Sequence, residues 1–401
     1  MTGLHLLAGI KVVSMEQFIA GPYCSSLLSD AGAEVIKVER PGTGEPRRTY
    51  QPRLGPEDDY VSGGFASYNR GKRSVEIDLR TEEGRESLLG LLADADVFLC
   101  NNRPGSLERL GLGVPELRER FPQLVICEIT GFGVSGGPYA EWPAFDSVIQ
   151  AMSGLSSLLG TAPEEPPLLA PMGTMDLLTG VYACLGILTA LVHRSRTGEG
   201  THVDAAMYDI GAAFLERPLT LHEFTGEVPT RGIDRFSPVG AFRAGDGGWI
   251  SIVIPTDEMW QRCCAAMGRS DLVEDPALDT VLKRAERMPD LVLPALEEWA
   301  AGMSQHEAVE SLRSAGQPAG AVQTIADVRE CPQLAHRGLF VPMQDERLVR
   351  DDGSHPALPR LPLLFNGEAA DPGIVPRLGE GNGLLNPPFV VGRSELPSPP
   401  D

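Results

Sequence analysis

The sequence has little positive charge. It holds 34 lysine and arginine residues against 55 aspartate and glutamate residues, so its formal net charge at pH 7 is -21. A chain this acidic repels the phosphates of nucleic acids and anionic membranes at long range, and we expect neither as a partner. An anionic small molecule needs only a local basic patch, which the first third of the chain can supply. Its basic residues include Arg40, Arg47, Arg48, Lys72, Arg73, Arg80, Arg103 and Arg109.

Paired cysteine motifs are also missing. The seven cysteines are odd in number, form no C-x-x-C pair, and several lie in apolar runs. This pattern indicates reduced thiols and a cytoplasmic location rather than a disulfide framework. Cys263 and Cys264 are adjacent, and His193 and His202 are isolated, so no spacing typical of zinc ligands is present. We expect no metal site.

Long hydrophobic runs are scarce. The first ten residues, MTGLHLLAGI, lack the basic and apolar regions of a signal peptide. The most apolar segment, Leu177–Val192, would span roughly 24 Å as a helix, which is short of a bilayer core. It also contains two glycines. We interpret it as a buried helix of a soluble protein.

The first 130 residues alternate between strand-like and helix-like segments. The expected strands are Ile10–Met15, Glu34–Val38, Ser74–Asp78, Val97–Cys100 and Leu124–Thr130. The expected helices between them are Pro22–Ala31, Glu82–Ala93 and Pro115–Phe121. Strands separated by helices of this length are typical of βαβ units, so we predict an α/β fold with a mostly parallel sheet.

The rest of the chain is more helical and divides into further segments. Helices are expected over Met175–Val192, Val203–Glu216, Glu258–Met267, Leu291–Ala301 and Gln305–Ala315. Residues Val239–Val253 read as a hairpin that turns at Asp246-Gly247-Gly248, and Ser304 with Glu307 forms a capping box. We predict a large domain over 1–200, a linker over 201–235, a small α+β domain over 236–325, a return to the large domain over 326–393 and a disordered tail over 394–401.

The loop Gly131–Gly137 contains two well-known patterns. It satisfies both G-x-G-x-x-G and G-x-S-x-G. A dinucleotide site or a nucleophile elbow requires a helix directly after such a loop, but Pro138 and Pro143 follow here. We interpret the segment as a glycine-rich loop near a ligand or as a simple turn.

Asp176 stands in the first turn of the apolar helix. An acid at this position can be a structural residue that the helix dipole and the free amides stabilise. It can also be a nucleophile, because the same amides would keep the carboxylate ionised while Gly173 and Gly180 leave room for a thioester. The residue types alone leave both interpretations open.

A series of motifs resembles the family III CoA-transferases, the group that includes formyl-CoA transferase, carnitine CoA-transferase and 2-methylacyl-CoA racemase. The motifs occur in the family's order over roughly 380 residues. They are Leu7–Val13 leading into Ala20-Gly21-Pro22, Gly32–Pro41, Asn69–Ser74, Asn101–Gly105, Gly131–Pro138, Gln150–Gly154, Arg196–Gly200, Gly316–Val322 and Leu378–Glu380.

The resemblance implies a fold and a reaction. The fold would be a Rossmann-like large domain built from both ends of the chain, a smaller α+β domain inserted late, and an interlocked homodimer. Asp176 matches the family's catalytic aspartate. It would carry coenzyme A from an acyl-CoA donor to a small carboxylic acid as an aspartyl-CoA thioester, with glycine-loop amides stabilising the oxyanions. Coenzyme A would be a substrate, and no cofactor would be permanently bound.

The resemblance also implies a set of residues that contact coenzyme A. Arg40 and Arg109 match phosphate-facing arginines, Ile77 and Arg80 match the strand beside the adenine, and Asn101 matches a residue near the pantetheine. Asn102 and Thr130 stand where the family usually has an aromatic residue and a lysine. The expected set is Arg40, Ile77, Arg80, Asn101, Asn102, Arg109 and Thr130.

Some positions depart from the family pattern and keep alternatives open. The racemase branch needs a histidine beside an aspartate, and Phe145-Asp146 stands here instead, which disfavours racemisation. Ile19 replaces a glutamine of formyl-CoA transferase, so we expect an acid less polar than formate or oxalate. Gly381 replaces the usual histidine after Leu-Gly-Glu. The alternatives are an acyl-CoA racemase, epimerase or isomerase of the same family, and a CoA-binding protein without catalytic activity.

Overall fold

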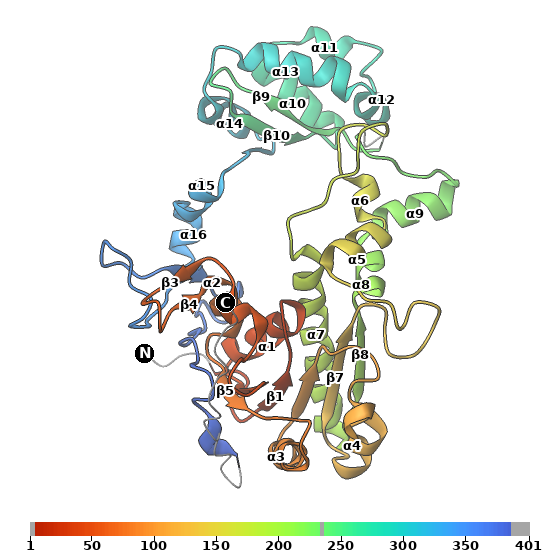
Figure 1. Cartoon of the computed structure of the whole chain (residues 1–401). Coiled ribbons are helices and arrows are strands. Elements are labelled where there is room, and N and C mark those ends of the chain that lie inside the picture. Colours follow the sequence, from red (N-terminus) through yellow and green to blue (C-terminus); the bar gives the residue numbers. More distant parts are fainter. Residues whose placement is uncertain (1–4, 233–235, 386–401) are drawn as a thin grey trace, which may run out of the picture. The chain divides into compact units, whose positions relative to one another are not determined.

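The computed structural model describes residues 5–232 and 236–385, and the chain divides into two compact units (Figure 1). Unit 1 consists of Met1–Ser156, Leu169–Glu227 and Ala335–Asp401. Unit 2 consists of Ser157–Leu168 and Val228–Leu334. Unit 1 therefore takes residues from both ends of the chain, and unit 2 is formed mainly by its later middle part.

Unit 1 is built on a parallel sheet of six strands. They are β1 (Lys11–Met15), β2 (Glu34–Glu39), β5 (Arg73–Glu76), β6 (Val97–Cys100), β7 (Val125–Thr130) and β8 (His202–Ala206). Their order in space is β5-β2-β1-β6-β7-β8, and every neighbouring pair is parallel. The strand order reverses between β1 and β6, and in such sheets ligands bind at the carboxyl ends of the strands at that point. The predicted α/β class with a parallel sheet is confirmed.

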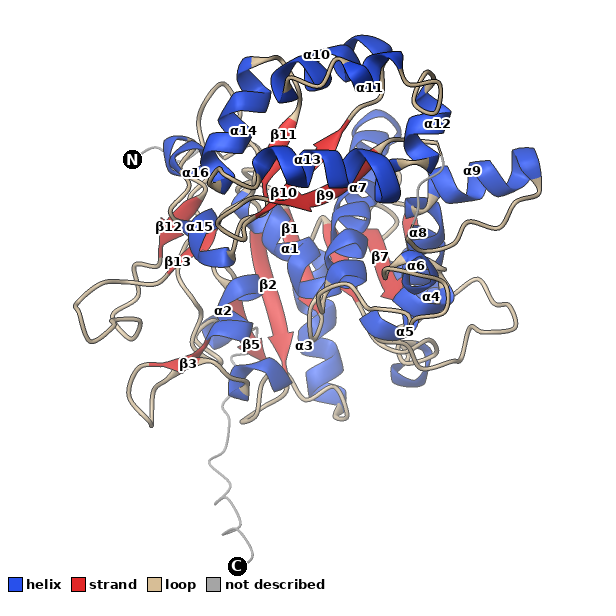
Figure 2. Ribbon diagram, turned by 90° about the horizontal axis from the view of Figure 1, so that it is seen from above, coloured by secondary structure: helices blue, strands red, loops and turns tan. Residues whose placement is uncertain are grey.

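Helices cover both faces of the sheet because the strands are apolar on both sides (Figure 2). Successive residues such as Val12 and Val13 are fully buried on opposite faces. The helices α1 (Ala20–Asp30) and α7 (Thr174–Thr197) pack on one face, and α3 (Glu82–Ala93) and α4 (Val114–Arg120) pack on the other. Free cysteines such as Cys24 and Cys127 belong to the first of these cores, as the sequence indicated.

The close crossing of α1 and α7 depends on Gly180. A Cβ atom at this position would lie 2.9 Å from the Ala20 carbonyl oxygen and 3.0 Å from Cδ1 of Tyr23, so a larger residue would push the helices apart. The helix α7 is long and apolar enough to cross a membrane, but one side of it packs on α1, β7 and β8. Its other side is exposed, so the expectation of a buried helix is only half right.

Shorter elements complete unit 1. They are η1 (Pro46–Thr49), β3 (Arg53–Leu54), β4 (Val61–Ser62), α2 (Gly63–Asn69), η2 (Glu108–Leu110), β12 (Phe340–Pro342), β13 (Ala357–Pro359) and η4 (Asn382–Leu384). The segment around η4 is hydrogen-bonded to β5. The amide of Gly381 donates to the Ser74 carbonyl oxygen at 2.7 Å, and the amide of Glu76 donates to Asn382 Oδ1 at 2.8 Å. Residues 394–401 lie outside the described part.

Unit 2 contains an antiparallel sheet and a set of helices with its own core. The sheet has the order β11-β10-β9. Its elements are β9 (Val239–Arg243), β10 (Trp249–Val253), α10 (Asp257–Met267), α11 (Asp271–Glu274), α12 (Val281–Glu286), η3 (Met288–Val292), α13 (Leu293–Ala300), α14 (Gln305–Ser314), β11 (Ala319–Ala321) and α15 (Ile325–Arg329), and α16 (Pro332–His336) follows. The predicted hairpin turn at Gly247 and the capping box of Ser304 with Glu307 are confirmed.

The segment 201–235 is where the sequence prediction was wrong. It is neither a linker nor a helix from residue 203, because its first residues form β8, the edge strand of the large sheet. The helices α8 (Met207–Phe214) and α9 (Glu216–Thr225) follow. The short segment Val203–Ala206, with three apolar residues around Asp204, has no periodicity that separates strand from helix, and pairing with β7 decides it.

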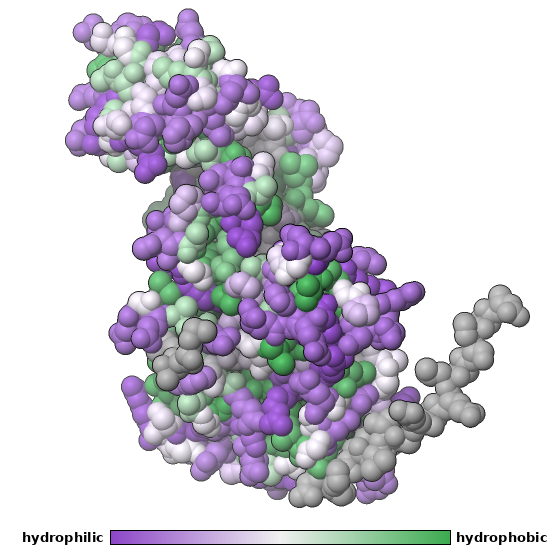
Figure 3. All heavy atoms as spheres, turned by 90° about the vertical axis from the view of Figure 1, so that its left-hand side faces the viewer, coloured by the Kyte–Doolittle hydropathy of each residue, from purple (hydrophilic) through white to green (hydrophobic). Residues whose placement is uncertain are grey.

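Polar side chains cover most of the face drawn in Figure 3, with small apolar patches between them. The full sequence carries a net charge of -21, which disfavours polyanionic partners at long range.

Candidate active site

The loop after β1 lies at the point where the strand order reverses. Asn101, directly after β6, accepts from the amide of Gln17 at 2.8 Å and donates to its carbonyl oxygen at 2.7 Å. Phe18 has a φ of 66°, which is unusual for a residue other than glycine, and its amide donates to Glu45 Oε1 at 2.9 Å. A strained backbone that its surroundings hold in place is typical of functional sites.

A buried network of charges fixes this loop from below. Glu16 accepts from Lys72 Nζ at 2.8 Å and from Ser25 Oγ at 2.7 Å, and Lys37 Nζ lies 2.8 Å from Glu45 Oε2. Burial alone would raise the pKa of Glu16, but Lys72 and Lys37 outweigh it and lower that pKa. Burial lowers the pKa of Lys72 to about 8. Since all these groups are almost inaccessible to solvent, the network is a rigid support.

The first turn of α7 is capped by a second acid. Asp146, at the start of α5 (Asp146–Met152), accepts from the amides of Met175 at 2.6 Å and Asp176 at 3.3 Å. Gln150 Nε2 donates to the same carboxylate at 2.7 Å. The amides at the start of α7 therefore donate to Asp146 and not to Asp176. The expectation that these amides keep Asp176 ionised was wrong.

The environment of Asp176 raises the pKa of its carboxyl group. Burial is the largest cause that raises its pKa, to about 7, and the negative charge of Asp146 adds to it, while Arg47 acts in the opposite direction. A carboxylate with a raised pKa is more basic, and a strongly shifted pKa at a sheet edge is typical of catalytic groups. Acylation of Asp176 would also remove its repulsion with Asp146, because an ester or thioester is neutral.

Apolar side chains lie near the start of α7. The Cδ1 atom of Ile19 lies 3.5 Å from the position of a Cβ on Gly173, the residue that precedes α7. Phe145 is 61% exposed and its ring centroid lies 5.8 Å from that of Phe18 in an edge-to-face arrangement. A phenylalanine here moves no proton, which agrees with the expectation against racemisation.

The glycine-rich loop is anchored by a residue that the sequence analysis missed. Asp204 of β8 accepts from the amides of Val134 at 3.0 Å and Ser135 at 3.2 Å and from Ser135 Oγ at 2.6 Å. Thr130 Oγ1 accepts from the amide of Gly133 at 2.9 Å. These amides are already used inside the protein, so they are poor candidates for the expected oxyanion role. The lone acid inside the apolar run of β8 was the available signal.

The residues expected to contact coenzyme A follow the carboxyl ends of β2, β5, β6 and β7. Arg40 and Arg109 are exposed, and Arg109 Nη2 donates to Ser106 Oγ at 3.0 Å. Arg80 is exposed and makes two 2.8 Å contacts with the Asp78 carboxylate. Of the remaining four, Ile77 and Thr130 are buried, and Asn101 and Asn102 are half-buried. The fold places all seven at one edge of the sheet, and their role as coenzyme A contacts stays a prediction.

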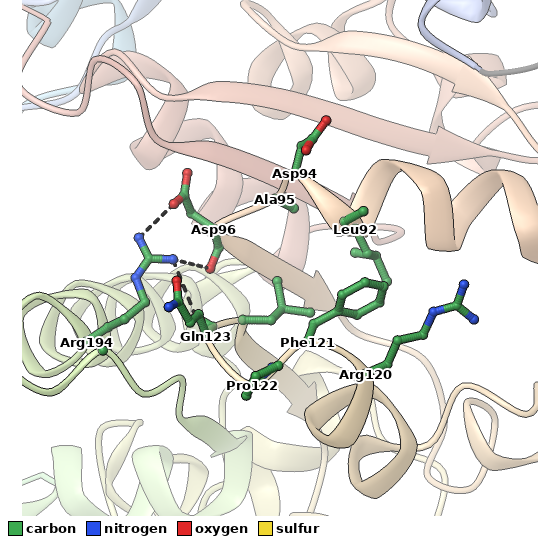
Figure 4. A pocket seen from close by; sticks show the side chains of 12 residues that line it. Leu92, Asp94, Ala95, Asp96, Arg120, Phe121, Pro122, Gln123 and Arg194 are labelled. Atoms are coloured by element: carbon green, nitrogen blue, oxygen red, sulfur yellow. Dashed lines mark hydrogen bonds and ion pairs between the residues drawn. The ribbon is translucent and has the colours of Figure 1, made fainter.

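A hollow of unit 1 lies elsewhere. It measures about 540 Å³ and lies at the opposite edge of the sheet, between the starts of β6 and β7 and the end of α7 (Figure 4). Figure 4 shows the Arg194 guanidinium turned to Asp96, and the two groups are 2.7 Å apart. No Ser, Cys, His or Lys side chain lines the hollow, and Asp96 is paired with Arg194, so we do not assign it a catalytic role. Within the described residues, no three His, Cys, Asp or Glu side chains lie close enough together to hold a metal ion.

Comparisons with known proteins agree with this geometry. A family model described as CoA-transferase family III matches residues 7–382. The chain is 37% identical to a succinyl-CoA:mesaconate CoA-transferase of Haloarcula hispanica, over 86% of this chain and 88% of the relative. It is 33% identical to an acetyl-CoA:oxalate CoA-transferase of Acetobacter aceti, over 83% and 85%. A crystal structure of a CAIB/BAIF family protein from Brucella suis superposes with a TM-score of 0.81 at 33% identity, over 94% of this chain and 97% of that one.

Proposed function

The chain belongs to CoA-transferase family III, and on that premise we propose that it moves coenzyme A between carboxylic acids through a thioester on Asp176. The observation that carries the proposal is the position of Asp176. Its carboxyl group lies at the carboxyl edge of the sheet, at the start of α7, with a pKa of about 7. It is ionised in a useful fraction at neutral pH and is more basic than an ordinary aspartate.

The proposed reaction has four acyl transfers. The Asp176 carboxylate attacks the donor thioester, the C–S bond breaks, and a mixed anhydride and coenzyme A thiolate form. The thiolate attacks the aspartyl carbonyl and releases the donor acid, which leaves the aspartyl-CoA thioester. The acceptor carboxylate attacks that thioester, and the thiolate then attacks the acceptor carbonyl of the second anhydride. Asp176 is regenerated as a carboxylate, and no proton is gained or lost.

The electrostatics around Asp176 support the covalent steps. The free carboxylate is destabilised by burial and by the charge of Asp146. Both the anhydride and the thioester are neutral at this side chain, so these unfavourable terms disappear when the intermediates form. Asp146 meanwhile holds the amides of Met175 and Asp176, which fixes the first turn of α7. Asp146 therefore acts as a positioning residue.

Coenzyme A would lie along the carboxyl edge of the sheet. We assign its phosphates to Arg40 and Arg109, because exposed guanidinium groups suit phosphate oxygens. Its adenine would lie beside Ile77 and Arg80, and its pantetheine arm would pass Asn101 and Asn102 toward Asp176. Thr130 would act indirectly, since its hydroxyl group fixes the glycine-rich loop.

The proposal includes a homodimer in the cytoplasm. The exposed side of α7 carries large apolar side chains that a second copy of the chain would cover, as in the interlocked dimers that the resemblance implies. They are Val181, Tyr182, Leu185 and Val192. Light scattering after gel filtration should give twice the mass of the chain, and Leu185→Glu should lower the dimer fraction.

The test is capture of the intermediate. The protein is incubated with an acyl-CoA, treated with hydroxylamine or borohydride, and its peptides are weighed. A hydroxamate or an alcohol at Asp176 is expected. An ¹⁸O-labelled acceptor acid should also leave one labelled oxygen on Asp176. An enzyme that transfers coenzyme A while Asp176 stays unmodified and unlabelled would refute the proposal. Mesaconate, malate, oxalate and glutarate belong in the acceptor panel, because the names of relatives contain these acids.

A further inference from the structure

Arg47 has an unusual environment for a half-buried arginine. Its Nε donates to the Gly64 carbonyl oxygen at 2.9 Å, and its guanidinium group lies over two aromatic rings, 5.6 Å from the centroid of Tyr50 and 5.4 Å from that of Tyr68. A Cβ atom on Gly64 would approach Nη2 to 2.9 Å, so the fold keeps this position small. The guanidinium plane is therefore held from several sides.

The terminal nitrogens of Arg47 are nevertheless unused. In the part of the chain that the structure describes, neither Nη1 nor Nη2 donates to an acceptor or forms an ion pair. Arg48, the next residue, shows the contrast, because Glu39 holds it with contacts of 2.8 and 2.6 Å and Pro376 accepts a third. Arg48 is thus a structural arginine, whereas Arg47 presents a fixed fork of donors with no partner.

The guanidinium group of Arg47 lies near Asp176. Tyr68, under Arg47, packs edge-on against Tyr23 with ring centroids 6.1 Å apart, and Tyr23 touches α7 at Gly180. Asp176 precedes Gly180 by four residues and so lies on the same face of the helix. The charges confirm this proximity, because Arg47 lowers the pKa of Asp176 although the two side chains form no ion pair.

A cation and an apolar side chain thus lie near the same helix start. Ile19 lies at the start of α7, and the Arg47 fork lies on the side of Tyr68. A planar fork of this kind is complementary to a carboxylate, and the isoleucine is complementary to methylene groups. The sequence analysis expected an acid less polar than formate or oxalate. That expectation explains Ile19 but gives no role to Arg47.

Resting on the proposed function, we infer that Arg47 binds the second carboxylate of a short aliphatic dicarboxylic acid whose first carboxylate reacts at Asp176. The acid would lie with its chain against Ile19 and its far end in the Arg47 fork. The same contact would hold the corresponding group of a dicarboxylic acyl donor. Arg47 is then the residue that selects diacids over monoacids of equal length.

The test compares succinate with butyrate, which differ only in a carboxylate against a methyl group at the far end. Acetyl-CoA is the donor, so that the donor itself does not need the fork. In wild type we expect a higher kcat/KM for succinate, mainly through KM. Arg47→Met keeps an apolar stem between the two tyrosines and should lower the succinate-to-butyrate ratio by about 30-fold, the loss typical of a charge-assisted bidentate pair. The succinate-to-butyrate ratio of Arg47→Lys should lie between those of wild type and Arg47→Met.

Arg53→Met is the matched control. Arg53 is an exposed arginine of the same segment that also lies over a tyrosine ring, 4.3 Å from the centroid of Tyr60, and its removal should leave the ratio unchanged. If Arg47→Met weakens both acids equally, or raises only the KM for acetyl-CoA, the fork serves Asp176 or coenzyme A and the inference is wrong.

Calorimetric binding of succinate and butyrate gives a readout that does not need turnover. Wild type should bind succinate more tightly, and Arg47→Met should bind the two acids alike. Equal binding by wild type overturns the inference even if Asp176 is labelled. Binding of succinate that depends on Arg47 without any adduct at Asp176 would instead refute only the covalent route.

Discussion

The two edges of the six-stranded sheet differ in how their charges are paired. At the amino edge, Asp96 pairs with Arg194 at 2.7 Å and also accepts from the amide of Lys11 at 2.7 Å, beside the hollow of about 540 Å³. At the carboxyl edge, two acids share one helix start and Arg47 has unused donors. The candidate catalytic residues therefore lie where charge is unpaired and the backbone is strained, away from this hollow.

The direction of the chain accounts for part of this difference. In a parallel sheet the carboxyl ends of the strands meet the amino-terminal, electropositive ends of the helices, which favour acids such as Asp146 and Asp176. The other end of α7 is electronegative, and it carries Arg194 and Arg196 in its last turn. The amino edge is thus stabilised by complementary charge, whereas at the carboxyl edge the first turn of α7 brings the carboxylates of Asp146 and Asp176 close together.

The largest expected effect is at Asp176. Asp176→Asn should lower the rate of coenzyme A transfer by at least about 1,000-fold, because an amide cannot form the anhydride. Asp96→Asn, at the other edge, should stay within about twofold of wild type. Acyl-CoA products are quantified by chromatography with a fixed donor and acceptor. Comparable losses in the two variants would remove the functional distinction between the edges.

The next effect is on the pH profile. Activity of wild type should rise as the pH passes about 7, because Asp176 must be ionised. Asp146→Asn retains an oxygen that can accept from Met175 but removes the negative charge. The pKa of Asp176 then falls and the midpoint should move down by about one pH unit. The profile of kcat/KM from pH 5 to 9 checks this, and an unmoved midpoint would mean that burial alone raises the pKa.

A smaller effect is expected on stability. The pKa of Asp176 is higher in the folded protein, about 7, than its ordinary value of 3.8, so the ionised group destabilises the fold above pH 7 and this effect fades as the pH falls toward 4. Asp176→Asn should therefore raise the free energy of unfolding at pH 8 by about 2 kcal/mol, a value reduced for the exposed part of the side chain.

Urea unfolding at pH 8 and pH 4 measures this difference. The stabilisation should be present at pH 8 and nearly absent at pH 4. A variant that is less stable than wild type at both values would show that Asp176 is a structural acid. That outcome would favour the first of the two interpretations that the residue types left open.

The smallest effect is expected at the amino edge. Arg194→Met breaks a partly exposed ion pair and should lower the free energy of unfolding by about 1 kcal/mol. Transfer activity should stay within about twofold, because the pair lies at the far ends of β6 and α7. Thermal unfolding and the standard assay check both values, and a large loss of activity without unfolding would assign the hollow a role in catalysis.

Much of the fold could be predicted because its signals are local. Helix α3 and strand β6 begin and end where the sequence predicted, and the Ser304 capping box is present. Strand β8 was missed because its three apolar residues, Val203, Ala205 and Ala206, carry no period that separates strand from helix, and only pairing with β7 makes the segment a strand.

The candidate site was predicted less completely. Asp176 was identified by resemblance, and its position at the carboxyl edge agrees with that prediction. Its protonation was predicted wrongly, because the capping amides are used by Asp146, 30 residues earlier in the chain. Asp204 is separated even further from the glycine-rich loop, because it lies 70 positions after Val134. Contacts over such separations leave no local pattern in a single sequence.

The amino-acid sequence by itself determined the α/β class, most helices and strands, the free thiols and the family. These properties depend on hydrophobic periodicity, turn residues and ordered motifs, which neighbouring residues specify. Only the tertiary structure decided that Asp176 titrates near pH 7, that β8 closes the sheet and that Arg47 has unused donors. Electrostatic shifts depend on burial and on charges distant in the chain, and these exist only once the chain has folded.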